Sequence, residues 1–264
     1  MEWDVSLLLY GLAVGLCAGV LAGFMAGLAG VGGGLIYVPV FYFLMPNSTG
    51  GMALAIFASM AAVAITSFFS AYRHWKLNHV DIRLFHRLWP GLLLGASLGL
   101  WSTLALPELL IFLALATLNA WVAYDYGRGL TVVRPHKDLL SFLGLPVGYV
   151  SGLLGIAGGT MLVPLLRRSV ALKVAVGTSA MSSAVMVTLA VFLNIIGESG
   201  WRDLLQEQWG FLLATWAGLL LTMPLAAKTS AAWHDKLDER HIRIILGSIF
   251  SVIAIMFCII AWAE

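Results

Sequence analysis

The sequence predicts an all-α polytopic membrane protein made of two inverted repeats, each a broken-helix (re-entrant) hairpin followed by three transmembrane helices. Composition gives the first indication, because 61% of the 264 residues are hydrophobic, 11% are charged and the mean hydropathy is +0.94. Soluble domains carry roughly 25% charged residues. The second indication is the stretch from Val5 to Tyr72, which contains no Asp, Glu, Lys or Arg. The third is a glycine-rich segment that occurs twice.

The repeated segment is the feature around which the chain is organised. Gly30-Val31-Gly32-Gly33-Gly34 leads to Val38-Pro39, and 125 residues later Gly155-Ile156-Ala157-Gly158-Gly159-Thr160 leads to Val163-Pro164. Each glycine costs a helix about 1 kcal/mol relative to alanine, so both segments predict a helix break. Irregular backbone at membrane depth is tolerated only where protein buries it or where it lines a polar cavity. We therefore expect the functional site at these breaks.

The repeat extends beyond the breaks and divides the chain into two halves. Phe57-Ala58-Ser59 and Gly177-Thr178-Ser179 occupy equivalent positions. Internal repeats of this kind are typical of secondary transporters. The predicted first repeat is 1–126, with a hairpin at 5–45 and spans at 52–75, 85–106 and 107–126. A cytoplasmic linker covers 127–138. The predicted second repeat is 139–264, with a hairpin at 139–167 and spans at 172–196, 209–231 and 242–263.

Basic residues predict the orientation of these segments. Cytoplasmic loops are enriched in Lys and Arg. If loops 73–87, 127–138, 167–173 and 228–243 are cytoplasmic, they hold 14 of the 15 Lys and Arg residues and leave only Arg202 outside. Both termini then lie outside, and the hairpins enter from opposite faces, so their tips can meet near the midplane. One alternative stays open, because 5–28 is long enough to cross completely and place its break at the cytoplasmic surface.

The breaks predict a site for an anion. The N-terminus of a helix carries about half a positive charge and unpaired N–H groups, and glycine lets a ligand approach them. The glycine strip of the first helix (Gly11, Gly15, Gly19, Gly23 and Gly27) is interpreted as a packing surface instead. The predicted substrate-binding residues are Gly30, Gly32, Gly33, Gly34, Ser59, Gly155, Gly158, Gly159, Thr160, Thr178 and Ser179, with Thr66, Ser67, His74, Ser182, Ser183 and Asn194 as secondary candidates.

Other classes of function have weaker support. No His-Glu-x-x-His motif, paired Asp or Cys-His cluster lies in the spans, so we expect no enzyme, no catalytic residue, no metal and no cofactor. Cys17 and Cys258 are interpreted as packing residues. The expected partners are a small anionic substrate and the lipid bilayer, with no nucleic acid and with oligomerisation open. An anion channel and a non-transporting membrane assembly subunit stay as alternatives to a permease.

A family resemblance agrees with this interpretation. The duplicated glycine segments closing in Val-Pro, the Val176-Gly177-Thr178-Ser179 element, and Ser70-Ala71-Tyr72-Arg73-His74 leading to Asn78-His79-Val80-Asp81 resemble the TauE/SafE sulfite exporter family of membrane permeases. The likeness covers nearly the whole chain. It implies movement of sulfite, a sulfonate, sulfoacetate or a related sulfur-containing anion, often out of the cell. We expect alternating access around the paired hairpin tips, in a bacterial plasma (inner) membrane. The chain departs from the family pattern at Phe57-Ala58-Ser59, where Gly-Thr-Ser is frequent.

Overall fold

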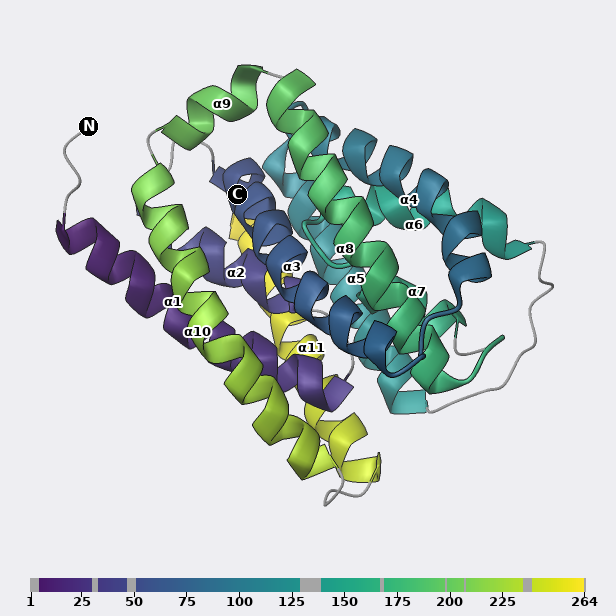
Figure 1. Cartoon of the computed structure of the whole chain (residues 1–264). Coiled ribbons are helices and arrows are strands. Elements are labelled where there is room, and N and C mark those ends of the chain that lie inside the picture. Colours follow the sequence, from purple (N-terminus) through teal and green to yellow (C-terminus); the bar gives the residue numbers. More distant parts are fainter. Residues whose placement is uncertain are drawn as a thin grey trace.

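The structure, a computed structural model, describes residues 5–29, 33–46, 51–128, 139–166, 169–197, 199–206, 208–234 and 239–263. These ranges form helices joined by short connections and contain no strand (Figure 1). The helices are α1 (Val5–Ala29), α2 (Gly34–Leu44), α3 (Gly51–Lys76), α4 (Ile82–Ser102), α5 (Glu108–Arg128), α6 (Leu139–Leu153), α7 (Gly159–Leu166), α8 (Leu172–Gly197), α9 (Ser199–Gln206), α10 (Trp209–His234) and α11 (Glu239–Ala263). Among the described residues, five stretches are long and apolar enough to cross a membrane: Val5–Phe24, Gly51–Lys76, Glu108–Asp125, Lys173–Gly197 and Trp209–Ala226.

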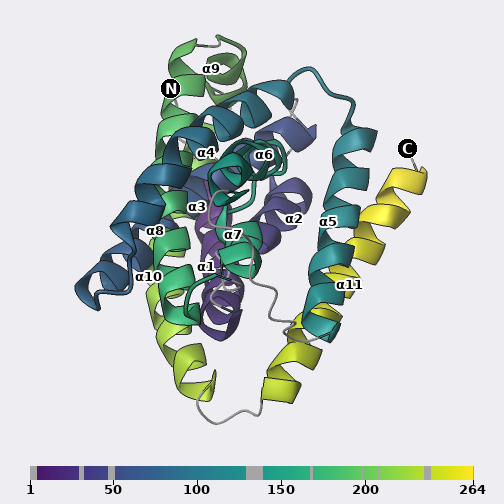
Figure 2. The same cartoon turned by 90° about the vertical axis from the view of Figure 1, so that its right-hand side faces the viewer.

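The helices pair across the two halves of the chain. Helix α1 lies along α10, α6 lies along α4, α3 packs on α8, and α5 packs on α11 (Figures 1 and 2). The half-helices pack mainly on a long helix of their own half, α2 on α3 and α7 on α8. Neither half therefore forms a separate core. The first long helix of each half depends on a helix of the other half for its partner.

Glycines allow the two longest of these pairings. A Cβ built on Gly23 of α1 would lie 2.6 Å from the Met223 carbonyl oxygen of α10, and Gly11, Gly15 and Gly19 meet the same helix. The packing role predicted for these four glycines is thus confirmed. Helices α4 and α6 meet in the same way, because Gly95 faces the Leu145 carbonyl and Gly148 faces the Leu92 carbonyl. Small residues let the backbones of membrane helices approach closely, so larger side chains here would force the helices apart.

Connections between helices gather at two ends of the molecule. At one end, the Met52 N–H donates to the Glu108 carboxylate (2.8 Å), and the Gln208 side-chain amide donates to the Pro46 carbonyl (3.2 Å). Helix α9 covers this end (Figure 1). Its Trp201 is fully buried against Phe57, with the ring centroids 5.0 Å apart.

At the opposite end, Asp81 begins α4 earlier than the expected span at 85–106. Its carboxylate accepts hydrogen bonds from the Arg83 and Leu84 N–H groups, which are donors that a helix cannot satisfy internally. The Asp81 N–H in turn donates to the Thr178 hydroxyl of α8 (2.9 Å). This residue therefore both caps one helix and fastens the α3–α4 connection to another.

The interpretation of the two cysteines is wrong. Cys17 of α1 and Cys258 of α11 are both exposed on their helices and form no disulfide. Cys258 borders an open groove between α11 and α5, and apolar composition alone does not reveal the exposure of either residue.

Candidate functional site

The two helix breaks meet in the interior of the molecule. A Cβ built on Gly34 would lie 2.7 Å from the Ala157 nitrogen and 2.8 Å from the Ile156 Cα. Gly34 begins α2 and Ala157 belongs to the turn before α7, so the N-termini of both half-helices lie side by side. The contact between tips that the sequence predicted is present. Gly30 and Gly32, also predicted to bind substrate, lie outside the described residues.

Helix α2 begins well before the end of α1. A Cβ on Gly33 would lie 2.5 Å from the Cβ of Ala22, which is seven residues before the last residue of α1, Ala29. Seven helical residues span about 10 Å. The α2 N-terminus is therefore drawn back along α1 rather than placed beyond its end, which favours the buried position over the alternative of a break at the surface.

The second break is held by the opposite half of the chain. Gly155 has φ +66, a conformation that favours glycine, and a Cβ there would lie 3.0 Å from the Ile56 Cα and carbonyl oxygen of α3. The Ser59 hydroxyl donates to the Gly155 carbonyl at 2.6 Å. Ser59, predicted as a substrate contact, thus also joins α3 to the break between α6 and α7.

The start of α7 is capped from α8. The Gly159 N–H donates to the Ser183 hydroxyl (3.1 Å), and the Thr160 hydroxyl donates to the Ala157 carbonyl (2.8 Å). The N–H groups of Ala157 and Gly158 find no acceptor among the described residues. Every residue from Leu154 to Thr160 is buried, so these two donors point into the protein interior.

The start of α2 has no side-chain cap. Gly33 is its N-cap residue, and the Gly33 carbonyl accepts from the N–H groups of Ile36 and Tyr37. The N–H groups of Gly34 and Leu35 have no acceptor in the part of the chain that the structure describes. Together with the N–H groups of Ala157 and Gly158, they place four buried donors around the contact between the breaks. No Asp, Glu, Lys or Arg occurs in 51–72 or 174–197, the supporting stretches of α3 and α8.

The predicted hydroxyls fall into two groups. Those of Ser179 and Ser182 are fully buried and lack a partner among the described residues. Others are engaged: Thr66 donates to the Val63 carbonyl (3.2 Å), and Thr178 accepts from Asp81. Ser67 is buried on α3. The structure therefore places Ser59, Thr160 and Ser183 directly on the second break, and Ser179 and Ser182 in the adjoining turns of α8.

Two secondary candidates lie away from the breaks. The Asn194 amide donates to the carbonyls of Ala190 (2.9 Å) and Ser97 (3.2 Å), which joins the later part of α8 to α4. His74 lies in the last turn of α3 beside His79, with the ring centroids 5.8 Å apart. These side chains belong to helix packing and to the α3–α4 connection rather than to the contact between the breaks.

The two repeats have different residues at equivalent positions, Phe57-Ala58 and Gly177-Thr178, because different segments pack on them. The His79 carbonyl lies directly against Gly177, where a side chain would collide with it, and Thr178 accepts the Asp81 N–H. On the equivalent stretch of α3, Trp201 packs on the Phe57 ring and the Trp216 indole N–H donates to the Ala58 carbonyl (3.4 Å). The departure from the family pattern thus accompanies a change from a short connection to one that contains α9.

Sequence reasoning missed two buried hydroxyls near the breaks. Tyr37 of α2 and Ser151 of α6 are fully buried, and their hydroxyls have no partner among the described residues. Tyr37 had a visible signal, because it is the one polar side chain between Leu35 and Phe41. Ser151 had none, since a single serine in an apolar helix commonly bonds its own backbone.

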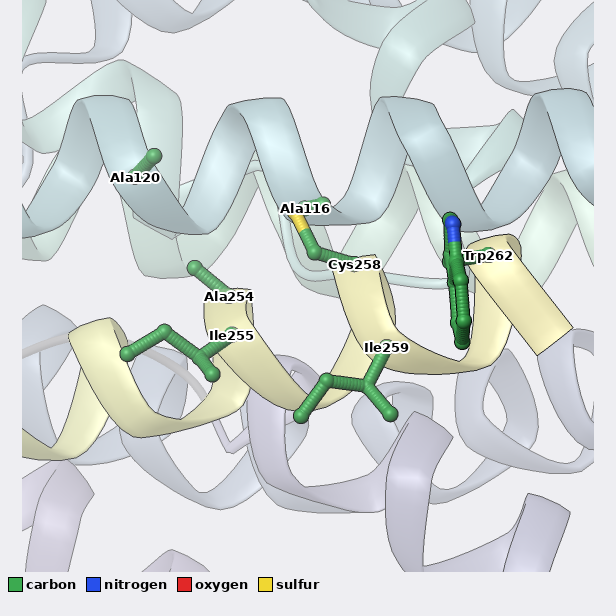
Figure 3. A pocket seen from close by; sticks show the side chains of 7 residues that line it. All are labelled: Ala116, Ala120, Ala254, Ile255, Cys258, Ile259 and Trp262. Carbon is green, nitrogen blue, oxygen red and sulfur yellow. The ribbon is translucent and has the colours of Figure 1, made fainter.

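An apolar groove lies elsewhere, between α5 and α11 (Figure 3). It encloses about 390 Å³ and is lined by Ala116, Ala120, Ala254, Ile255, Cys258, Ile259 and Trp262. Figure 3 shows small alanines between the two helices and the Trp262 ring beside them. Apart from the Trp262 indole N–H and the Cys258 thiol, the lining is hydrocarbon and is unsuited to an anion, so this groove does not compete with the breaks as the anion site.

Comparisons with known proteins agree with this picture. A family model described as "Sulfite exporter TauE/SafE" matches residues 15–257. A "Probable membrane transporter protein" of Haemophilus influenzae is 30% identical over 223 residues, covering 80% of this chain and 84% of that protein. Another "Probable membrane transporter protein", from Methanocaldococcus jannaschii, is 24% identical over 250 residues, covering 86% of this chain and 88% of that protein. No solved structure matches.

Proposed function

Because this chain belongs to the TauE/SafE sulfite exporter family and is a membrane transporter, we propose that it carries a small sulfur-containing oxyanion across the membrane. The observation that supports this most is the set of four buried N–H donors where the N-termini of α2 and α7 meet. Aligned peptide dipoles make such termini attractive to anions. The supporting stretches of α3 and α8 contain no charged residue, so the site would bind an anion without a permanent counter-ion and could also release it.

The proposed mechanism is alternating access between two inverted repeats. The helix pairings support it, because exchanging the halves turns the α1–α10 pair into the α6–α4 pair and leaves the α3–α8 and α5–α11 pairs unchanged. Helices α5 and α11 are equivalent by chain order and antiparallel: Phe112 stacks on Phe257 (6.1 Å), whereas Ala123 faces Gly247. A twofold axis along the membrane normal would make such a self-paired set parallel, so this arrangement favours an axis in the membrane plane.

Binding and counterflow test the function. Purified protein is heated with sulfite, sulfate, thiosulfate, sulfoacetate, taurine or an alkylamine of similar size, and reconstituted protein is assayed for exchange. We expect oxyanions to raise the melting temperature and the amine to leave it unchanged. Taurine should stabilise less than sulfoacetate, because nothing near the breaks pairs with its ammonium group. Stabilisation by the amine alone would contradict the proposal, and flux without saturation or counterflow would favour the alternative, an anion channel.

Orientation is tested by labelling. We propose that export proceeds through a bacterial inner membrane with both termini outside, since that arrangement places 14 of 15 basic residues inside. In a cysteine-free background, single cysteines at Asn47 and Glu198 should react with an impermeant reagent from outside, and those at His79, Arg134 and Arg168 only after permeabilisation. Labelling of residue 168 from outside would mean that the second hairpin crosses the bilayer, and the inverted arrangement would then be abandoned.

A further inference from the structure

The two breaks share one local geometry but present different side chains. On α2, a Cβ built on Gly33 would lie 3.0 Å from the Cζ and Cε2 atoms of Tyr37, so the phenol end covers the break. On α7, a Cβ built on Gly158 would lie 3.4 Å from Cδ1 of Leu162. Gly33 and Gly158 are repeat equivalents, and so are Tyr37 and Leu162. A phenol hydroxyl therefore stands where the other half places an alkyl group.

The neighbouring helix shows the same contrast. The Thr66 side chain of α3 lies beside the Tyr37 hydroxyl. Its repeat equivalent on α8 is Met186, whose Cε would lie 3.3 Å from the same Cβ on Gly158. All four side chains are at least 97% buried. The first break is thus covered by a polar pair, Tyr37 and Thr66, and the second by an apolar pair, Leu162 and Met186.

The Tyr37 hydroxyl is a donor without an acceptor in the described residues. Thr66 donates its own proton to the Val63 carbonyl (3.2 Å), and no hydrogen bond of ordinary geometry joins it to the phenol. Buried hydroxyls are almost always paired, because leaving one unpaired forfeits its hydrogen bonds to water. A phenol O–H is also well suited to an oxyanion, since hydrogen bonds to charged acceptors are stronger than neutral ones.

We propose that Tyr37 donates a hydrogen bond to the transported oxyanion and that Leu162 and Met186 contact the carbon chain of an organic anion, so that the site binds its substrate in one orientation. This assignment rests on the proposed function and deepens it. The acidic group of a sulfonate would lie on the α2 side, near the Gly34 and Leu35 N–H groups, and its alkyl part on the α7 side. Inorganic sulfite, which has no carbon chain, would make no such contact with the apolar pair.

A chain-length series tests the assignment. Affinities of the purified full-length protein are measured by calorimetry for sulfite and for methane-, ethane- and propanesulfonate. Each methylene buried on the apolar pair should tighten binding by about fourfold. Tyr37→Phe should weaken binding of all four anions by about tenfold or more and leave the dependence on chain length unchanged. Met186→Thr, which introduces the residue found at the equivalent position of the first repeat, should flatten the dependence of affinity on chain length.

Thermal stability without ligand separates binding from folding. Tyr37→Phe removes no hydrogen bond of ordinary geometry among the described residues, so its melting temperature should match or exceed that of the wild type. Tyr149→Phe is the control, because its hydroxyl pairs with Ser102 (3.3 Å) between α6 and α4; it should lower the melting temperature and keep the affinity.

The outcomes are distinguishable. Suppose that the wild-type protein binds the sulfonates. If Tyr37→Phe then binds them equally well, or if Met186→Thr keeps the full dependence of affinity on chain length, this assignment is wrong and the proposed function still holds. Wild-type protein that binds none of these anions would overturn the proposed function together with the assignment.

Discussion

The two breaks have the same backbone plan and different support. In the second, the Ser183 hydroxyl caps Gly159, Ser59 of the other half holds the Gly155 carbonyl, and every described residue of the turn is buried. In the first, α2 starts at Gly34 with no side-chain cap. The position equivalent to Ser183 is Val63, whose side chain cannot accept a hydrogen bond. The second break is therefore held by side chains, whereas the first presents its donors to whatever occupies the site.

The difference in capping between the two breaks indicates which features both repeats must have and which only one repeat must have. Both breaks require glycine, because Gly34 and Gly155 each lie within contact distance of another segment's backbone. A capping hydroxyl is required at only one break, because the capped N-terminus of α7 can hold the uncapped N-terminus of α2 in position. We therefore expect substitutions at the first break to affect binding most, and substitutions at the second to affect stability most.

The largest effect is expected at Gly34. Alanine there would bring a methyl group within 2.7 Å of the Ala157 nitrogen, and backbone cannot move aside as a side chain can. Gly34→Ala should abolish measurable anion binding and destabilise the protein by roughly 1–3 kcal/mol, a typical cost of overpacking. The matched variant is Gly158→Ala, which meets only side-chain atoms, at 3.2–3.4 Å, and should bind within about threefold of wild type. Equal losses of anion affinity in Gly34→Ala and Gly158→Ala would contradict the proposed difference between the two breaks.

A smaller effect on stability is expected at Ser59. Ser59→Ala leaves the Gly155 carbonyl without its 2.6 Å hydrogen bond, which should cost about 1–3 kcal/mol of unfolding free energy. Its repeat equivalent, Ser179, has a buried hydroxyl with no partner among the described residues, so Ser179→Ala should preserve stability and weaken anion binding. Denaturation and calorimetry on both variants decide this, and a stability loss at Ser179 equal to that at Ser59 would count against a ligand role.

The smallest effect on binding is expected at Thr178, which the sequence placed in the site. Its hydroxyl accepts the Asp81 N–H at 2.9 Å, so Thr178→Val should lower the unfolding free energy by about 1 kcal/mol. The anion affinity should stay within about twofold of wild type. A tenfold loss of anion affinity at unchanged stability would contradict this prediction and indicate that Thr178 contacts the anion.

The sequence predicted the helical class, the breaks and their meeting because each depends on local rules. Glycine clusters break helices wherever they occur, and runs without charge require a membrane. It could not predict the partners of individual hydroxyls. Thr178 and Ser179 are adjacent in the chain, yet one is bonded to the α3–α4 connection and the other is unpartnered among the described residues. That distinction depends on which helix of the other half packs against each residue.

Tyr37 is a second residue whose environment the sequence could not predict. Its position in an apolar half-helix was visible, but a tyrosine there is equally compatible with the membrane interface, where its hydroxyl would meet water. Only the contact with Gly33 and the complete burial of the side chain place the phenol over the break. The exposure of Cys17 and Cys258 was hidden for a related reason, because lipid-facing and protein-facing positions have the same apolar composition.

The central claim is that an oxyanion binds where the two breaks meet, and locating a heavy-atom oxyanion tests it most directly. Crystals of the protein grown with selenite, an analogue of sulfite, would be measured at the selenium absorption edge. We expect an anomalous peak within hydrogen-bonding reach of the Gly34 and Leu35 N–H groups and of the Tyr37 hydroxyl. Selenium found only among the exposed basic residues of the connections, with none at the breaks, would contradict it.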